Sequence, residues 1–261
     1  MKWFFAFGEG SPAFEEYSAM IKVAAHTAKR FTRLEPVFMY DGRPCELTEW
    51  LKGHGVTVVH RRWKLIAEYE RVVKETGLAH HASYASAMFL RTEIPRLCEE
   101  QGWTDEEVLY TDCDIMFAGD PEPLLPDLWG AFVGLAPEMD PADPDNVNSG
   151  VMAMRLPALR TVDEAFERFI VKNMAECADY GDQFAYKTFF RHGWKPMAPE
   201  LNWKPYWGEN PDARIIHFHS PKPFVRPALA SGAASLTQRQ LARGAFVRYC
   251  EIWDEALAAI D

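Results

Sequence analysis

The sequence predicts an α/β fold in which a mostly parallel central sheet is flanked by helices. The first sixty residues alternate between apolar strand patterns and amphipathic helical patterns, and such alternation is typical of parallel sheets. It predicts strands at 2–7, 35–40 and 56–59 and helices at 12–30 and 47–51. A further apolar run, residues 108–110, has the composition of a strand covered on both faces.

The second half of the chain predicts further elements of the same kind. Residues 137–146 are rich in Pro and Asp and predict a long irregular loop. A loop of that length between core elements is more often functional than not. The remaining patterns predict strands at 131–135, 147–154 and 214–219 and helices at 81–101, 162–177, 182–190 and 236–260. No internal repeat or linker divides the sequence, so we expect one domain over residues 1–261.

Composition excludes several classes of protein. The chain has 261 residues, 48% hydrophobic and 25% charged, which is ordinary for a globular protein. Its net charge of −10 argues against a nucleic-acid partner. No apolar run approaches the ~18–20 residues of a membrane helix, and the apolar start is too short for a signal peptide. The five cysteines are odd in number and lack CxxC spacing, so we expect reduced thiols in a cytoplasmic protein.

Two carboxylates follow the strand at 108–110. Asp112 and Asp114 are two residues apart, so on an extended chain they project from the same side. Two neighbouring carboxylates repel each other, and a hard cation such as Mg²⁺ or Mn²⁺ relieves the repulsion. The carboxyl end of a strand is also where open α/β sheets bind ligands. The alternative is a strand-to-loop exit with two unrelated acids.

Other segments limit the kind of site. The sequence contains neither GxGxxG nor a P-loop, so glycine-cradled phosphates are not expected. Gly150, in the predicted strand at 147–154, suggests close approach by a ligand or backbone. Arg61, Arg62 and Lys64 lie in a polar stretch that we interpret as a solvated helix or loop, with a mobile cover over a phosphate-bearing ligand as the alternative.

Taken in order, five motifs resemble those of nucleotide-sugar glycosyltransferases of family 8, retaining enzymes of the type-A fold that include bacterial galactosyl- and glucosyltransferases and glycogenin. The motifs are Tyr84–Pro95 with Arg91, Leu109–Ile115, Asn148–Met152, Tyr180–Gln183 and Ile216–Phe224. The resemblance implies a Rossmann-like nucleotide-binding half over residues 1–120. It also implies a donor-sugar and acceptor half over residues 121–261, ending in a helix.

The resemblance also implies roles for individual residues. Metal binding is implied for Asp112, Asp114 and a histidine, for which we prefer His217 to His219. Asp182 and Gln183 are implied to lie beside the reacting carbon. Donor contacts are implied for Glu9, Arg91, Asn148, Gly150 and Lys222, and acceptor contacts for Asn202 and Trp203. The sequence departs from the family pattern at Ser220, which replaces Gly, and at Phe224, which replaces Trp.

The function that the resemblance implies is metal-dependent transfer of a hexose from a nucleotide sugar, a UDP-sugar by preference, to a glycan, glycolipid or protein acceptor. Mn²⁺ or Mg²⁺ is the expected cofactor. One alternative is a degenerate type-A fold that only binds a nucleotide or glycan. A second is a phosphatase or phosphotransferase that uses Asp-x-Asp. The terminal helix carries Arg239, Arg243 and Arg248 beside apolar residues, so peripheral membrane contact is an alternative to packing on the fold.

Overall fold

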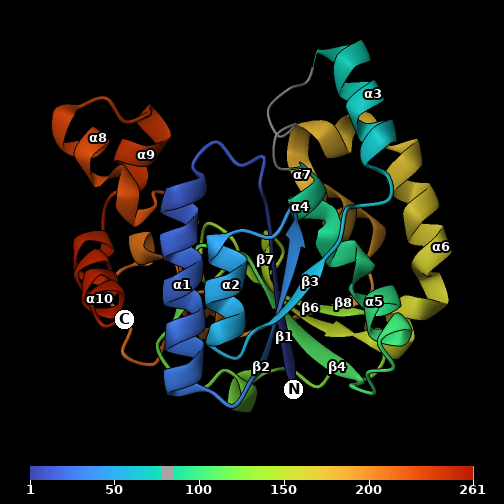
Figure 1. Cartoon of the computed structure of the whole chain (residues 1–261), viewed down its shortest axis with the longest axis horizontal. Coiled ribbons are helices and arrows are strands. Elements are labelled where there is room, and N and C mark those ends of the chain that lie inside the picture. Colours follow the sequence, from blue (N-terminus) through green and yellow to red (C-terminus); the bar gives the residue numbers. More distant parts are fainter. Residues whose placement is uncertain (78–84, 261) are drawn as a thin grey trace.

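A computed structural model of the protein describes residues 1–77 and 85–260. A seven-stranded sheet of order β3-β2-β1-β4-β7-β6-β8 lies between two layers of helices (Figure 1). Four of its neighbouring pairs are parallel, and β7 runs antiparallel to both β4 and β6, so the sheet is mostly parallel as predicted. The strands are β1 (Lys2–Gly8), β2 (Glu35–Asp41), β3 (Thr57–His60), β4 (Glu107–Thr111), β6 (Val133–Pro137), β7 (Val147–Arg155) and β8 (Trp194–Pro196).

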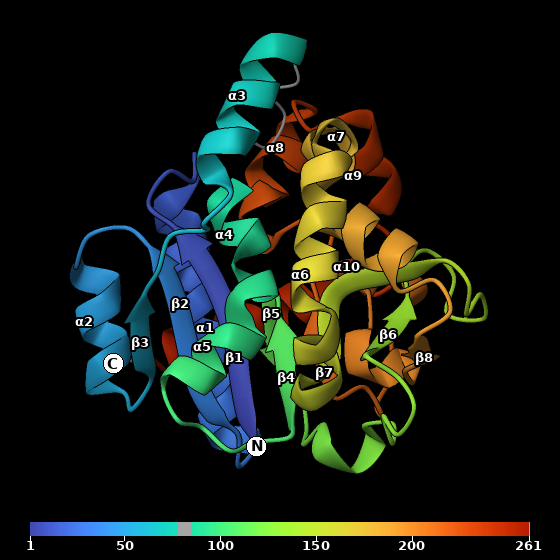
Figure 2. The same cartoon turned by 90° about the vertical axis from the view of Figure 1, so that its right-hand side faces the viewer.

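Helices cover both faces of the sheet. In Figure 1, α1 and α2 lie on one side and α4 to α7 on the other, and Figure 2 shows α4, α5 and α6 in front of the strands. α10 packs against the outer side of α1. The helices are α1 (Phe14–Phe31), α2 (Glu46–Gly53), α3 (Ile66–Thr76), α4 (Ala85–Phe89), α5 (Ile94–Glu100), α6 (Leu156–Lys172), α7 (Met174–Phe189), α8 (Arg226–Ser231), α9 (Leu236–Leu241) and α10 (Phe246–Ala258). None of these described helices is both long and apolar enough to span a membrane.

The apolar strand patterns are explained by burial on two faces. In β1, Trp3 and Phe5 pack into the core under α1 and α2, whereas Phe4 packs into the core under α4 to α7. Alternate side chains of a strand point to opposite faces, so a strand covered on both sides needs apolar residues at every position. β4 follows the same rule, with Leu109 on one face and Tyr110 on the other.

A second, two-stranded sheet brings distant residues together. β5 (Ile115–Phe117) pairs antiparallel with β9 (Ile215–His217), and Ile115 lies opposite His217. Because Ile115 directly follows Asp114, this pairing places the histidine beside the Asp-x-Asp segment. About one hundred residues of sequence separate the two strands.

Several predicted boundaries were wrong. The first helix begins at Phe14, with Ala13 at its N-cap position, and not at residue 12 as predicted. The single helix predicted at 236–260 is divided into α9 and α10, with Gly244 between them at φ +62°. The helix predicted at 182–190 is the second part of α7, which kinks at Gly181. Residues 81–84 of the predicted helix at 81–101 lie outside the described residues.

The basic stretch at 61–64 forms ion pairs. Arg61 contacts Glu93 and Glu100, Arg62 contacts Glu70, and Lys64 contacts Glu167. Its cations are therefore paired with carboxylates, and α3 follows as a helix with exposed charges, as the favoured interpretation expected. These pairings give no support to a phosphate-covering role.

Candidate functional site

A cavity of about 540 Å³ opens at the carboxyl ends of β1 and β4. It is lined by the segment before α1, by Tyr17 of α1 and by residues 220–222, 224 and 225. Five residues predicted from the sequence line it: Arg91, Asp112, Asp114, Asp182 and Lys222. This is the edge of an open α/β sheet where ligands bind.

The carboxylates of Asp112 and Asp114 meet His217 beside this cavity. One ligand atom from each of the three residues lies within 4.8 Å of the others. His217 Nε2 is 3.2 Å from Asp114 Oδ1 and 3.9 Å from Asp112 Oδ2. His217 and Asp114 are buried, and the Asp112 side chain is one-third exposed.

The second histidine, His219, faces elsewhere. Its Nδ1 is 3.4 Å from the Tyr206 hydroxyl and its Nε2 is 3.9 Å from Glu138. Burial, with added repulsion from positive neighbours, lowers the pKa of His219 to about 3. The geometry therefore favours His217 as the third member of the cluster.

The donor set fits a divalent cation. Asp114 Oδ1 is buried and accepts no hydrogen bond from the described residues. An unpartnered buried carboxylate oxygen is costly, and a cation between Asp112, Asp114 and His217 removes that cost. Two carboxylate oxygens and an imidazole nitrogen suit a metal such as Mn²⁺. The cluster could hold a divalent metal.

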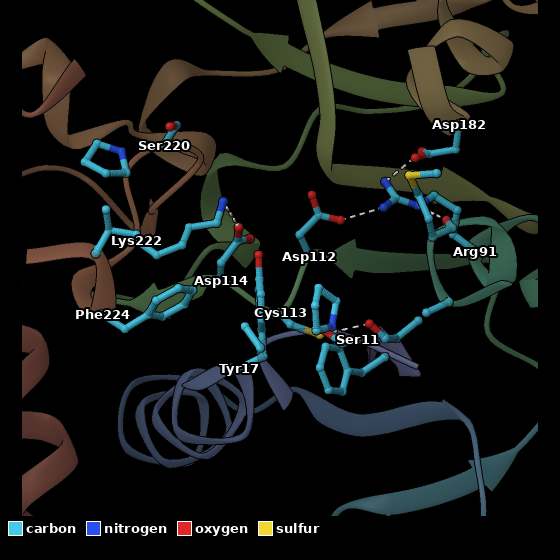
Figure 3. A pocket seen from close by; sticks show the side chains of 18 of the residues that line it. Ser11, Tyr17, Arg91, Asp112, Cys113, Asp114, Asp182, Ser220, Lys222 and Phe224 are labelled. Atoms are coloured by element: carbon cyan, nitrogen blue, oxygen red, sulfur yellow. Dashed lines mark hydrogen bonds and ion pairs between the residues drawn. The ribbon is translucent and has the colours of Figure 1, made fainter. Parts of the chain in front are cut away.

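Lys222 is the other cation beside Asp114. Its ammonium group lies 2.5 Å from Asp114 Oδ2 and donates to the His219 carbonyl oxygen at 2.6 Å. Burial opposes ionisation of Asp114, but the positive charge of Lys222 outweighs it and holds the pKa of that carboxyl below its usual range. Figure 3 shows Asp114 directed toward Lys222, whereas Asp112 points toward Arg91.

Arg91 forms ion pairs with Asp112 of the Asp112–Asp114–His217 cluster and with Asp182. Its guanidinium is 2.5 Å from Asp112 Oδ1 and 3.1 Å from Asp182 Oδ2 (Figure 3). It also donates to the Ser149 carbonyl oxygen at 2.6 Å. It also lies 4.1 Å from the centre of the Tyr110 ring. These contacts fix the guanidinium between two carboxylates that line the cavity.

Asp182 begins the second part of α7, directly after the non-helical Gly181. Burial raises the pKa of Asp182 to about 6, although the Arg91 guanidinium opposes the shift. Its carboxylate also accepts a hydrogen bond from the Ser149 hydroxyl at 3.1 Å. Asp182 is therefore a buried acid that changes its charge near neutral pH.

Gly150 lies where no side chain fits. A Cβ atom at this position would stand 2.3 Å from His217 Cε1 and 2.7 Å from Asp112 Oδ2. The sequence suggested close approach by a ligand or by backbone at this glycine, whereas the groups that approach it are side chains of His217, Asp112 and Asn148.

Asn148, Gln183 and Asn202 are hydrogen-bonded to one another behind the cluster. Asn148 Nδ2 donates to Gln183 Oε1 at 2.9 Å, and Asn202 Nδ2 donates to Asn148 Oδ1 at 3.1 Å. Asn202 has no exposed surface, so contact with an acceptor would require it to be uncovered. The donor contact of Asn148 and the acceptor contact of Asn202 stay predictions.

Glu9 and Trp203 lie apart from the cavity lining. Glu9 is exposed and accepts a hydrogen bond from the Arg43 backbone amide at 3.0 Å. Trp203 is half-buried, and its indole nitrogen donates to the Gly208 carbonyl oxygen at 2.8 Å. The donor role of Glu9 and the acceptor role of Trp203 stay predictions.

Three residues of the site were not singled out from the sequence. Ser149 contacts both Arg91 and Asp182, and its place inside the Asn148–Met152 motif was the available signal. Glu138 accepts a hydrogen bond from Gln183 Nε2 at 3.0 Å and belongs to the long loop predicted to be functional. Tyr17 lines the cavity, but its position on an amphipathic helix gave no such signal.

Solved structures identify the fold. The glycosyltransferase GlyE of Streptococcus pneumoniae TIGR4 matches with a TM-score of 0.68 at 18% identity, over 100% of this chain and 61% of GlyE. The galactosyltransferase LgtC, solved in complex with donor and acceptor sugar analogues, matches with a TM-score of 0.65 at 16% identity, over 100% of this chain and 96% of LgtC. The chain has the type-A glycosyltransferase fold.

Mouse xyloside xylosyltransferase 1 is also similar to this type-A chain, with a TM-score of 0.56 at 16% identity over 83% of this chain and 96% of the mouse protein. No protein-family model matches the sequence, and a search of the curated proteins finds no match. The chain spans about three fifths of the length of GlyE. At these identities the likeness establishes the fold, which the sequence had predicted.

Proposed function

We propose that this type-A chain is a single-domain glycosyltransferase that moves a hexose from a nucleotide sugar, by preference a UDP-sugar, to a hydroxyl group of a glycan, glycolipid or protein. One observation carries the proposal: Asp112, Asp114 and His217 converge beside a cavity of about 540 Å³ in a protein with this fold. A cavity of this size suits a small-molecule ligand. Retention of configuration is part of the proposal and rests on the resemblance.

The chemistry requires stabilisation of a diphosphate leaving group. A divalent cation held by Asp112, Asp114 and His217, with Mn²⁺ preferred to Mg²⁺, supplies positive charge where negative charge develops on the phosphates. Lys222 adds a second positive charge on the same side of the cavity. Its flexible ammonium group can turn from Asp114 to a phosphate oxygen.

The donor sugar is proposed to lie toward Arg91 and Asp182. Arg91 holds the carboxylates of Asp112 and Asp182 on either side of its guanidinium and so fixes their separation. Ionised Asp182 would orient sugar hydroxyls or stabilise positive charge on the sugar ring. Gln183, whose amide is a poor nucleophile, is proposed to hold its neighbours in place, since its side chain contacts Asn148 and Glu138.

A binding protein with the same fold is the second candidate. The observation that favours it is that Asn202, a predicted acceptor residue, is fully buried and already hydrogen-bonded to Asn148 and His217. The phosphatase alternative has less support, because Asp112 Oδ1 is already paired with Arg91 and no role remains for His217 or Lys222.

Donor hydrolysis tests the proposal. The protein is incubated with a panel of UDP- and GDP-sugars, with Mn²⁺ or with EDTA, and the released nucleoside diphosphate is measured. Asp114→Asn is compared with Asp212→Asn, a control at an exposed position. Manganese-dependent turnover of one donor that only Asp114→Asn abolishes supports the transferase. Metal-dependent nucleotide binding without turnover, also in the presence of glycan acceptors, favours the binding protein, and neither binding nor turnover overturns both.

A further inference from the structure

A chain of hydrogen bonds through four side chains runs from Gln183 to His217 of the Asp112–Asp114–His217 cluster. Gln183 Oε1 accepts from Asn148 Nδ2 at 2.9 Å, Asn148 Oδ1 accepts from Asn202 Nδ2 at 3.1 Å, and Asn202 Oδ1 lies 2.8 Å from His217 Nδ1. The four residues come from four separate elements: α7, β7, the 3-10 turn Pro199–Asn202 and β9. Asn148, Asn202 and His217 are 4%, 0% and 1% exposed, so water does not satisfy their polar atoms.

Two backbone amides determine the direction of every hydrogen bond in this line. The Gly150 N–H donates to one end of the Asn148 amide at 3.0 Å, which must therefore be Oδ1. The Ser149 N–H donates to one end of the Gln183 amide at 3.1 Å, which must be Oε1. A backbone N–H cannot accept a hydrogen bond, so neither amide can be turned over without losing one.

The orientation of the Asn202 amide then determines which of its atoms faces His217. Because Asn148 presents an oxygen to Asn202, the facing atom of Asn202 must be the donor Nδ2. The other end of the Asn202 amide is then Oδ1, an acceptor, and it faces His217 Nδ1. If the Asn202 amide were rotated by 180°, its Oδ1 would face Asn148 Oδ1. Both oxygens would then be buried without a hydrogen-bond donor, which is energetically costly.

We propose that Asn202 is a positioning residue that holds His217 in the tautomer with hydrogen on Nδ1, so that Nε2, the ring nitrogen nearest to Asp112 and Asp114, keeps its lone pair free for a metal. The inference rests on the metal site of the proposed function and not on sugar transfer. Histidine ligands in proteins are commonly oriented by a partner on the second ring nitrogen.

The opposite tautomer, with hydrogen on Nε2, would prevent His217 from binding a metal. Hydrogen on Nε2 would occupy the ring nitrogen nearest to Asp114 and Asp112 and leave no lone pair there for a metal. Asn202→Leu keeps the approximate volume of the side chain but removes its acceptor. In this variant we expect His217 to change to the Nε2–H tautomer and the affinity for Mn²⁺ to fall about 10- to 100-fold. Asn202→Asp keeps an acceptor at the same position, so we expect the Nδ1–H tautomer and Mn²⁺ affinity within about threefold of the wild type.

The experiment has two readouts. Long-range ¹H–¹⁵N spectra of the metal-free protein report which ring nitrogen of His217 carries hydrogen, and the His217→Gln variant assigns its signals. Titration with Mn²⁺ alone, followed by electron paramagnetic resonance, gives the metal affinity. Thr48→Val is the control. Thr48 lies in α2, is fully buried and exchanges hydrogen bonds with the Cys45 backbone, far along the chain from the cluster. Its loss should lower stability without changing either readout.

The outcomes separate the inference from the metal site. An Nδ1–H signal in the wild type, a change of tautomer with weaker Mn²⁺ binding in Asn202→Leu, and recovery of both in Asn202→Asp support the inference. An Nε2–H signal in the wild type overturns it, and this measurement needs no variant to fold. Unchanged tautomer and affinity in Asn202→Leu also overturn it. A wild type that has the Nδ1–H tautomer and binds no Mn²⁺ contradicts the proposed metal site and leaves the tautomer inference standing.

Discussion

Gly150 lies against His217 so closely that a methyl group on the glycine would stand 2.3 Å from the imidazole carbon Cε1. The same methyl group would be 2.7 Å from Asp112 Oδ2. His217 and Asp112, two of the three groups that could hold a metal, can therefore take these positions only because residue 150 of β7 has no side chain. No room is left beside these two groups for a side chain at position 150.

Gly150→Ala is expected to disturb the cluster through this contact. We expect at least tenfold weaker Mn²⁺ binding and a loss of about 1–3 kcal/mol in the free energy of unfolding, since overpacking forces neighbouring groups to move. Calorimetric titration with Mn²⁺ and urea denaturation measure the two effects. Gly53→Ala is the matched control, because no atom lies within 4 Å of a Cβ at that position. Equal Mn²⁺ affinity in the two variants would contradict the packing argument.

The two histidines of β9 and its continuation are expected to behave differently. His217 lies 3.2 Å from Asp114, whereas His219 lies beside Tyr206 and Glu138. His217→Gln should therefore lose Mn²⁺ binding at least tenfold, and His219→Gln should keep it within about twofold. Direct titration with Mn²⁺ distinguishes them, and the reverse order of effects would show that the wrong histidine is assigned.

Lys222 and a metal both neutralise Asp114, so removal of Lys222 should act in opposite directions on two ligands. Lys222→Met is expected to raise the affinity for Mn²⁺ alone, because the ammonium group 2.5 Å from Asp114 is gone. The same variant should bind UDP in the presence of Mn²⁺ about tenfold more weakly or worse, because one charge-assisted hydrogen bond to phosphate is lost. Titrations with each ligand measure this, with Lys74→Met at an exposed position as control. If Lys222→Met lowered the affinities for both Mn²⁺ and UDP, the inference that Lys222 and the metal compete for Asp114 would be contradicted.

Asp182 should make stability depend on pH. Its pKa is raised from 3.8 to about 6 by burial, so the folded protein holds this proton more tightly than the unfolded chain. The fold therefore carries a penalty that is complete above about pH 6 and disappears below about pH 4. In urea denaturation, the free energy of unfolding of Asp182→Asn relative to the wild type should rise by about 2–3 kcal/mol from pH 4 to pH 7. If the difference in the free energy of unfolding stayed constant over this pH range, the raised pKa of Asp182 would be contradicted.

The sequence was sufficient for the strands and for the Asp-x-Asp edge. Runs such as Trp3–Phe7 are apolar at every position because helices cover both faces of the sheet, and this pattern is local. The direction of β7 could not be predicted in this way, since a strand buried on both faces has the same composition whether it runs parallel or antiparallel.

The interior of the site was less predictable. Asn202 contacts Asn148, 54 residues earlier, and His217, 15 residues later, and no spacing rule connects these positions. Sequence reasoning placed Asn202 at the acceptor because only the motif order was available. The break between α9 and α10 was missed for a similar reason: a Cβ on Gly244 would stand 2.8 Å from the Pro205 carbonyl oxygen, a contact that only the folded chain creates.

Metal-dependent binding of UDP is the measurement that tests the central claim most directly. UDP is titrated into the wild type and into Asp114→Asn, with Mn²⁺ and with EDTA, and the dissociation constants are compared. If Asp112, Asp114 and His217 hold a metal that binds the diphosphate, the wild type with Mn²⁺ should bind UDP at least tenfold more tightly than either the EDTA sample or the variant. Equal affinity in all samples would contradict the claim that this cluster is the metal site of a nucleotide-sugar transferase.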